Sequence, residues 1–176
     1  MALEKWNIDT SHSGIHLTVR HMVIAKVRGR FTRWGGTIEL DEQNPAASRV
    51  SADIDAASID TSEEKRDAHL RSADFLDVEK FPRITFNSTR IEPKGESEVR
   101  VTGYLAIHGV TKPITFTAER LGRAKDPWGA ERVVFSAVAA LDRKDFGLKW
   151  NQALDAGGVL VGDRVDITLE IEAVKA

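Results

Sequence analysis

Arg66, Asp67 and His69 form a tight cluster of side chains whose types could perform acid–base chemistry. An imidazole can move protons, and a guanidinium can bind an anionic group. Residues two apart do not share a helical face, so Asp67 and His69 would not form a dyad on a helix, and no nucleophile is placed beside them. Arg66 and His69 are three apart and do share a face. The residues alone favour ion pairing on the surface of a helix that caps the barrel; Arg66 and His69 could also meet an anionic head group there, and catalysis stays as the alternative.

The histidines near the start of the chain give a weak metal signal. His12 and His16 share a strand face by the period of two, and His21 follows them. Structural zinc sites usually take four Cys or His ligands, and the chain has no cysteine. The Gly-Gly pairs at 35–36 and 157–158 lack the strand-to-helix fingerprints that bind phosphates or dinucleotides. We therefore expect no metal, no cofactor and no catalytic residue.

The composition is that of a globular protein whose 176 residues fit a single domain, 1–176. A hydrophobic share of 41%, a charged share of 30% and a net charge of −2 argue against disorder and against a polybasic surface that would bind nucleic acid. No apolar run reaches the length of a membrane span, so we expect no stable membrane insertion. The first residues lack the apolar stretch of a secretory signal, which predicts a cytoplasmic protein, or a periplasmic one if a leader has been removed.

Alternation of apolar and polar residues is the dominant pattern and predicts β-strands with one buried face. The clearest strands cover residues 15–20, 50–54, 84–89, 99–107, 114–119 and 165–172. His108-Gly109 is typical of a two-residue hairpin turn. We predict an all-β fold with one short helix and about eight antiparallel strands, a number that can close into a barrel wide enough for one small ligand.

One segment departs from the alternation and positions the cluster described first. Thr61-Ser62-Glu63-Glu64 matches a capping box and predicts a helix that runs to about Ala73. Charged residues outnumber apolar ones on this helix, so it should lie across the barrel and not fill it.

The aromatic residues could either line a cavity or fill a solid core. They are Phe31, Phe86, Phe116, Phe135 and Trp150. Strand spacing alone leaves both alternatives open.

The chain resembles the YceI-like polyisoprenoid-binding family across nearly its whole length. The most distinctive matching segment is Arg66-Asp67-Ala68-His69-Leu70-Arg71-Ser72-Ala73-Asp74-Phe75-Leu76. Other matching segments, in the same order and spacing, are Ile8-Asp9, His12-Ser13, Arg20-His21, Val27-x-Gly29-x-Phe31, Ser58-Ile59-Asp60-Thr61, Phe81-Pro82, Thr85-Phe86, Ser88-Thr89, Gly103-Tyr104-Leu105, Gly109-Val110-Thr111-Lys112-Pro113, Asp126-Pro127-Trp128-Gly129 and Lys144-Asp145-Phe146-Gly147.

This resemblance implies an extended, lipocalin-like antiparallel barrel with an apolar lumen for a long isoprenoid chain. Such a chain needs few specific contacts, because each methylene moved from water into apolar surroundings gains about 0.8 kcal/mol. We predict that the lumen wall includes Ile15, Leu17, Val19, Ile84, Phe86, Val101, Leu105, Phe116 and Phe135. For the head group at the mouth we predict His21, Arg66 and His69.

Two functions from different classes follow. The first is binding of an isoprenoid amphiphile, such as a polyprenyl diphosphate or a quinone, for transport, storage or sequestration without chemistry. The second is an enzyme that acts on the lipid head group through Arg66, Asp67 and His69. The expected partner is an isoprenoid lipid, with no nucleic acid, and a homodimer stays open as an alternative.

Overall fold

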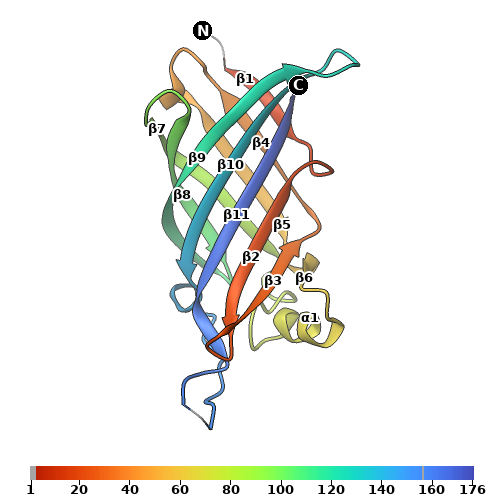
Figure 1. Ribbon diagram of the computed structural model, residues 1–176, viewed down its shortest axis with the longest axis vertical. Coiled ribbons are helices and arrows are strands. Elements are labelled where there is room, and N and C mark those ends of the chain that lie inside the picture. Colours follow the sequence, from red (N-terminus) through yellow and green to blue (C-terminus); the bar gives the residue numbers. More distant parts are fainter. Residues whose placement is uncertain (1–2, 156) are drawn as a thin grey trace.

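The computed structural model describes residues 3–155 and 157–176, which form one continuous antiparallel sheet (Figure 1). The strands are β1 (Glu4–Ile8), β2 (Gly14–His21), β3 (Ala25–Phe31), β4 (Trp34–Leu40), β5 (Arg49–Asp55), β6 (Ile59–Asp60), β7 (Arg83–Pro93), β8 (Glu98–Ile107), β9 (Val110–Lys125), β10 (Glu131–Asp142) and β11 (Val161–Lys175). The helical segments are α1 (Glu64–Arg71) and three 3₁₀ turns, η1 (Pro45–Ala47), η2 (Ala56–Ser58) and η3 (Arg143–Phe146).

Eight of these strands close into a barrel. Their order is β1-β4-β5-β7-β8-β9-β10-β11, and β11 pairs back with β1. Closure leaves no sheet edge in the ring, so every wall strand has two neighbours. The predicted mainly antiparallel fold, with an eight-stranded barrel and one short helix, is confirmed.

The remaining strands form a second ladder that branches from β11. Strand β2 pairs with β11 and with β3, and β3 pairs with the two-residue β6. The β1–β4 ladder ends at Asn7↔Thr37, whereas the β2–β3 ladder begins at His16↔Arg30. Between these two pairs, no residue of 8–15 pairs with a residue of 31–36. We call this opening in the sheet the wall gap.

Local sequence signals explain the helix and the tightest hairpin. His108 and Gly109 have φ angles of 56° and 73°, as the predicted two-residue turn requires. The helix is shorter than predicted and starts later, because Glu63 caps it by accepting a hydrogen bond from the Arg66 amide. Thr61 does not cap the helix, since its hydroxyl and its amide both donate to the buried Asp67.

Side chains fill both ends of the barrel. At the end that carries both chain termini, Trp6 is fully buried and the Arg123 guanidinium lies 5.0 Å from the centre of its ring. Arg123 makes ion pairs with Glu4 and Glu131 at 3.2 and 3.1 Å, and Lys175 pairs with the same two carboxylates at 2.7 and 3.1 Å. At the opposite end, near α1, a cluster of buried side chains includes Arg143, Phe146 and Leu148. Within the part of the chain that the structure describes, no helix is both long enough and apolar enough to cross a bilayer.

Candidate functional site

An apolar cavity of about 280 Å³ occupies the barrel interior. Among the described residues that line it, Ser48 and Ser136 are the polar ones, and the rest are aliphatic, aromatic or proline side chains. The cavity presents no charged side chain among the described residues that line it. Its composition suits an apolar chain, and its volume lies near the lower end of the range of about 300–1,000 Å³ typical of small-molecule sites.

The alternating strands build this cavity because every second side chain points inward. Phe86 on β7 and Phe116 on β9 meet inside it with ring centroids 5.7 Å apart. Gly103 on β8 permits this arrangement, since a Cβ at that position would lie 2.6 Å from the Phe86 ring. A larger residue at 103 would clash with the Phe86 ring and with the backbone carbonyl of Asn87.

The structure places eight of the nine predicted wall residues on the cavity. They are Ile15, Leu17, Ile84, Phe86, Val101, Leu105, Phe116 and Phe135. Val19 is not among the lining residues. It is half-buried on β2 and pairs with Val27 and with Val165, and Val165 itself lines the cavity.

Several lining residues escaped the sequence analysis because they do not lie on clear alternating runs. Trp34 follows the interruption between β3 and β4, and Leu76 and Leu148 come from connecting segments. Their large apolar side chains were visible in the sequence, but only the tertiary structure brings loop residues to the lumen.

The residues predicted for the head group do not line the cavity. Arg66 donates from Nε to the Thr61 hydroxyl and from a terminal nitrogen to the Thr61 carbonyl, both at 2.7 Å. His69 lies 2.8 Å from Asp74 through Nε2 and packs edge-on against Phe75 and Trp150. These contacts hold α1 to its flanking segments.

His21 does not share the environment of the helix. It ends β2 and pairs with Val161 and with Ala25. The described part of the chain therefore shows no contact that joins His21 to Arg66 or His69.

The cluster of Arg143, Phe146 and Leu148 at the barrel end near α1, which we call the plug, is built around a buried charge. Arg143 is 3% exposed, and its guanidinium donates to the carbonyls of Leu148, Gly162 and Val161 at 2.5, 2.8 and 3.3 Å. Burial lowers the pKa of Arg143, while the nearby Asp163 and Asp142 oppose that shift. Leu148, which Arg143 holds by its carbonyl, lines the cavity.

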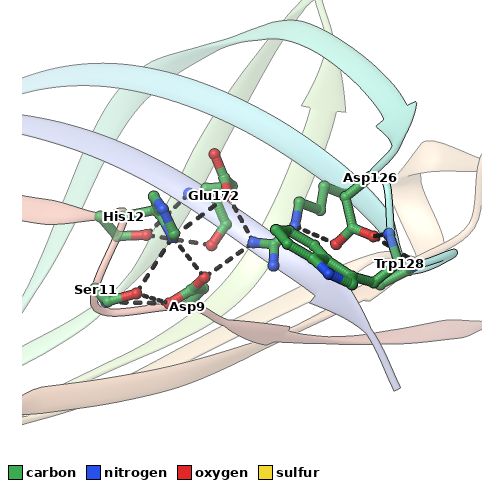
Figure 2. Close-up of polar contacts among 9 residues, drawn as sticks. Asp9, Ser11, His12, Asp126, Trp128 and Glu172 are labelled. Carbon is green, nitrogen blue, oxygen red and sulfur yellow. Dashed lines mark hydrogen bonds and ion pairs between the residues drawn. The ribbon is translucent and has the colours of Figure 1, made fainter.

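A polar network lies where β1 gives way to β2 (Figure 2). One terminal nitrogen of Arg132 donates to Asp9 at 2.9 Å and to Glu172 at 2.6 Å, and its Nε donates to Asp126 at 2.9 Å. His12 Nδ1 lies 2.8 Å from Asp9. The ligand atoms of Asp9, His12 and Glu172 lie within 4.8 Å of one another, but the guanidinium already supplies the positive charge between the carboxylates. The network joins the β1–β2 connection, β10, β11 and the β9–β10 turn.

This network predicts loss of stability in acid. Hydrogen bonds from Ser11, and then from Arg132 and His12, hold the pKa of Asp9 well below its ordinary value of 3.8. A carboxyl with a depressed folded-state pKa stabilises the fold above its unfolded pKa and loses that effect as the pH falls below it. We expect the unfolding midpoint to fall between pH 5 and pH 2, and the fall to be shallower in Asp9→Asn, as thermal denaturation across that pH range would measure.

The control for this prediction is Asp166→Asn, at an exposed carboxyl paired with Arg164 on β11. Equal pH profiles for Asp9→Asn and the unchanged protein would contradict the prediction.

Comparisons with known proteins agree with this architecture. A model of the YceI-like domain matches residues 6–173. A UPF0312 protein of Vibrio cholerae serotype O1 is 39% identical over 170 residues, which cover 96% of this chain and 86% of that protein. Among solved structures, BcnA of Burkholderia cenocepacia is similar with a TM-score of 0.83 at 22% identity, covering 94% of this chain and 98% of BcnA.

A further solved structure is a polyisoprenoid binding domain from Saccharophagus degradans, with a TM-score of 0.71 at 14% identity, covering 97% of this chain and 98% of that one. At such identities the two structural likenesses concern the fold alone. The family model and the sequence identity extend over nearly the whole chain, and they show that this protein belongs to the YceI-like family.

Proposed function

We propose that this protein binds a long-chain isoprenoid amphiphile in the barrel cavity and carries, stores or sequesters it without chemical change. The observation that carries the proposal is the cavity itself, which is enclosed by the barrel and lined almost wholly by apolar side chains. Transfer of about ten methylene groups from water into such surroundings would gain about 8 kcal/mol before the cost of ordering the chain. The polyisoprenoid binding domain from Saccharophagus degradans has the same fold, which supports this class of ligand.

The contacts of the three residues considered for catalysis favour binding without chemistry. Arg66 and Asp67 are both engaged with Thr61, and His69 is engaged with Asp74. None of the three lines the cavity. A general acid or base must come within hydrogen-bond reach of the reacting atom, which these positions do not offer to a ligand held in the lumen.

The direct test is native mass spectrometry of freshly purified protein, followed by lipid extraction. We expect a bound species whose extracted mass and fragments are those of an isoprenoid, because a buried apolar chain should leave slowly. The proposal would be contradicted if no isoprenoid co-purifies with the protein and the purified protein does not bind added geranylgeraniol.

The enzyme alternative is tested with the same protein and geranylgeranyl diphosphate. We expect binding without release of phosphate. Phosphate release that is reproducible and is abolished in His69→Ala would instead support catalysis by the α1 cluster.

A further inference from the structure

A second pocket, of about 460 Å³, opens on the outer surface at the wall gap. Its lining comprises residues 10–16, residues 30–32, Trp34 and Glu170. These segments flank the stretch in which the β1–β4 and β2–β3 ladders leave the wall unpaired. The pocket is therefore a feature of the barrel wall and not of either barrel end.

Three residues connect this outer pocket to the lumen. Ile15, Phe31 and Trp34 line both the apolar cavity and the outer pocket. Only side chains separate the two spaces at these positions, because no strand pair crosses the wall gap. Rotation of side chains between staggered rotamers can open such a barrier without breaking a strand ladder.

The barrel ends are poorer routes for a lipid. Opening one end would expose the fully buried Trp6 and disrupt the ion pairs around Arg123. Opening the other would remove the hydrogen bonds of the buried Arg143. The first change exposes a large apolar ring, and the second leaves a buried guanidinium and its carbonyl partners unpaired, and each costs more than side-chain rotation at the wall gap.

The outer rim carries donors suited to an anion. His16 and Arg30 face each other across the first pair of the β2–β3 ladder, and both line the outer pocket. Within the described residues, neither makes a side-chain hydrogen bond, and Arg30 has a long ion pair of 3.7 Å with the partly exposed Asp60. By contrast, the Ser11 hydroxyl already donates to Asp9 and the Thr32 hydroxyl to the Ser58 carbonyl. Glu170 is the carboxylate among the residues that line this pocket.

We propose that the wall gap is the lateral portal of the barrel, and that His16 and Arg30 bind the phosphate or diphosphate head group of a lipid whose chain lies in the lumen. This inference rests on the proposed function and deepens it by assigning the head group and the route of entry. Arg30 presents a planar set of donors that matches phosphate oxygens, and His16 supplies a further donor beside it. A chain too long for the cavity can leave through the same opening, because the portal joins the lumen to solvent.

Equilibrium binding tests the head-group site. The probes are geranylgeranyl diphosphate and geranylgeraniol, which share a chain and differ in the head group. The double variant His16→Gln/Arg30→Gln is expected to bind the diphosphate roughly tenfold more weakly or worse, since charge-assisted hydrogen bonds are lost, and to bind the alcohol unchanged. Arg28→Gln removes one charge from the same strand and the same face, without lining the pocket, and is expected to change neither affinity.

The outcomes separate this inference from the proposed function. If the unchanged protein binds neither lipid, the proposed function fails. If it binds both but the double variant loses no diphosphate affinity, or Arg28→Gln loses as much, only the head-group site fails. A selective loss in Arg66→Gln/His69→Gln instead would move the head group to α1 and overturn the assignment to His16 and Arg30.

Kinetics test the portal independently of the head group. The natural chain has no cysteine, so a single Thr10→Cys can be modified at the wall gap with a polyethylene-glycol maleimide. We expect modification to slow both association and release of geranylgeraniol, while the same modification of Thr117→Cys on β9 leaves both rates unchanged. Equal rates for the two modified proteins would overturn the lateral route.

Discussion

Leu105→Trp is expected to weaken binding of geranylgeraniol about tenfold while leaving the protein folded. Leu105 is 7% exposed, points inward from β8 and lines the cavity. In a solid core the larger side chain would cost roughly 1–3 kcal/mol of stability, whereas an open cavity can absorb the added volume. If the indole displaces about two methylene groups of the bound chain, the affinity falls by about 1.6 kcal/mol, or roughly tenfold. Titration calorimetry and thermal denaturation of the lipid-free protein measure the two effects.

The matched control is Thr102→Trp on the same strand. Thr102 faces the opposite side of β8, where its hydroxyl lies 3.0 Å from that of Thr115. The Thr102→Trp substitution is expected to have little effect on lipid binding or on the unfolding midpoint. A sharp drop in the midpoint of lipid-free Leu105→Trp, with unchanged lipid uptake by the folded fraction, would show that the lipid lies elsewhere.

Arg143→Leu is expected to produce the largest loss of stability among the substitutions considered, about 2–4 kcal/mol. The change leaves the carbonyls of Leu148 and Gly162 without their side-chain donor, and a buried unsatisfied polar group costs about 1–3 kcal/mol. The Val161 carbonyl keeps a donor in this variant, because it also accepts a hydrogen bond from the Asn151 side-chain amide at 2.7 Å. Chemical denaturation with urea measures the free energy of unfolding.

Arg164→Leu provides the comparison for this experiment. The Arg164 side chain is 74% exposed and makes an ion pair with Asp166, a contact worth less than about 1 kcal/mol. We expect its stability to differ little from that of the unchanged protein. A similar small effect for Arg143→Leu would mean that the buried guanidinium does not hold the plug.

The wall of the lumen could be predicted from the sequence because side-chain direction in a strand is a local property. Successive residues point to opposite faces, so the apolar members of an alternating run share one side wherever the strand lies. This reasoning placed Leu105 and Phe116 on the inward face, where the structure has them. It also named Val19, which is not among the lining residues although its partner Val165 is, because alternation gives the face of a residue and not its contact with the cavity.

The polar residues were harder to assign, because their partners depend on which distant segments meet. The α1 cluster has the composition of an anion site, yet Arg66 is held by Thr61 and His69 by Asp74. In the sequence His16 was part of a weak metal signal, and nothing singled out Arg30. They gained significance only when the pairing of β2 with β3 set them opposite each other beside an opening.

The sequence by itself determined the strand periodicity, the hairpin at His108-Gly109, eight residues of the apolar wall and the resemblance to the YceI-like family. Only the tertiary structure decided where the ladders stop, which side chains close the barrel ends and that His16 and Arg30 lie together at the wall gap. The physical reason is the separation along the chain of the residues that interact. Strand periodicity and turn geometry arise from the backbone of neighbouring residues, whereas contacts such as Arg132 with Asp9, 123 positions apart, exist only after the barrel has closed.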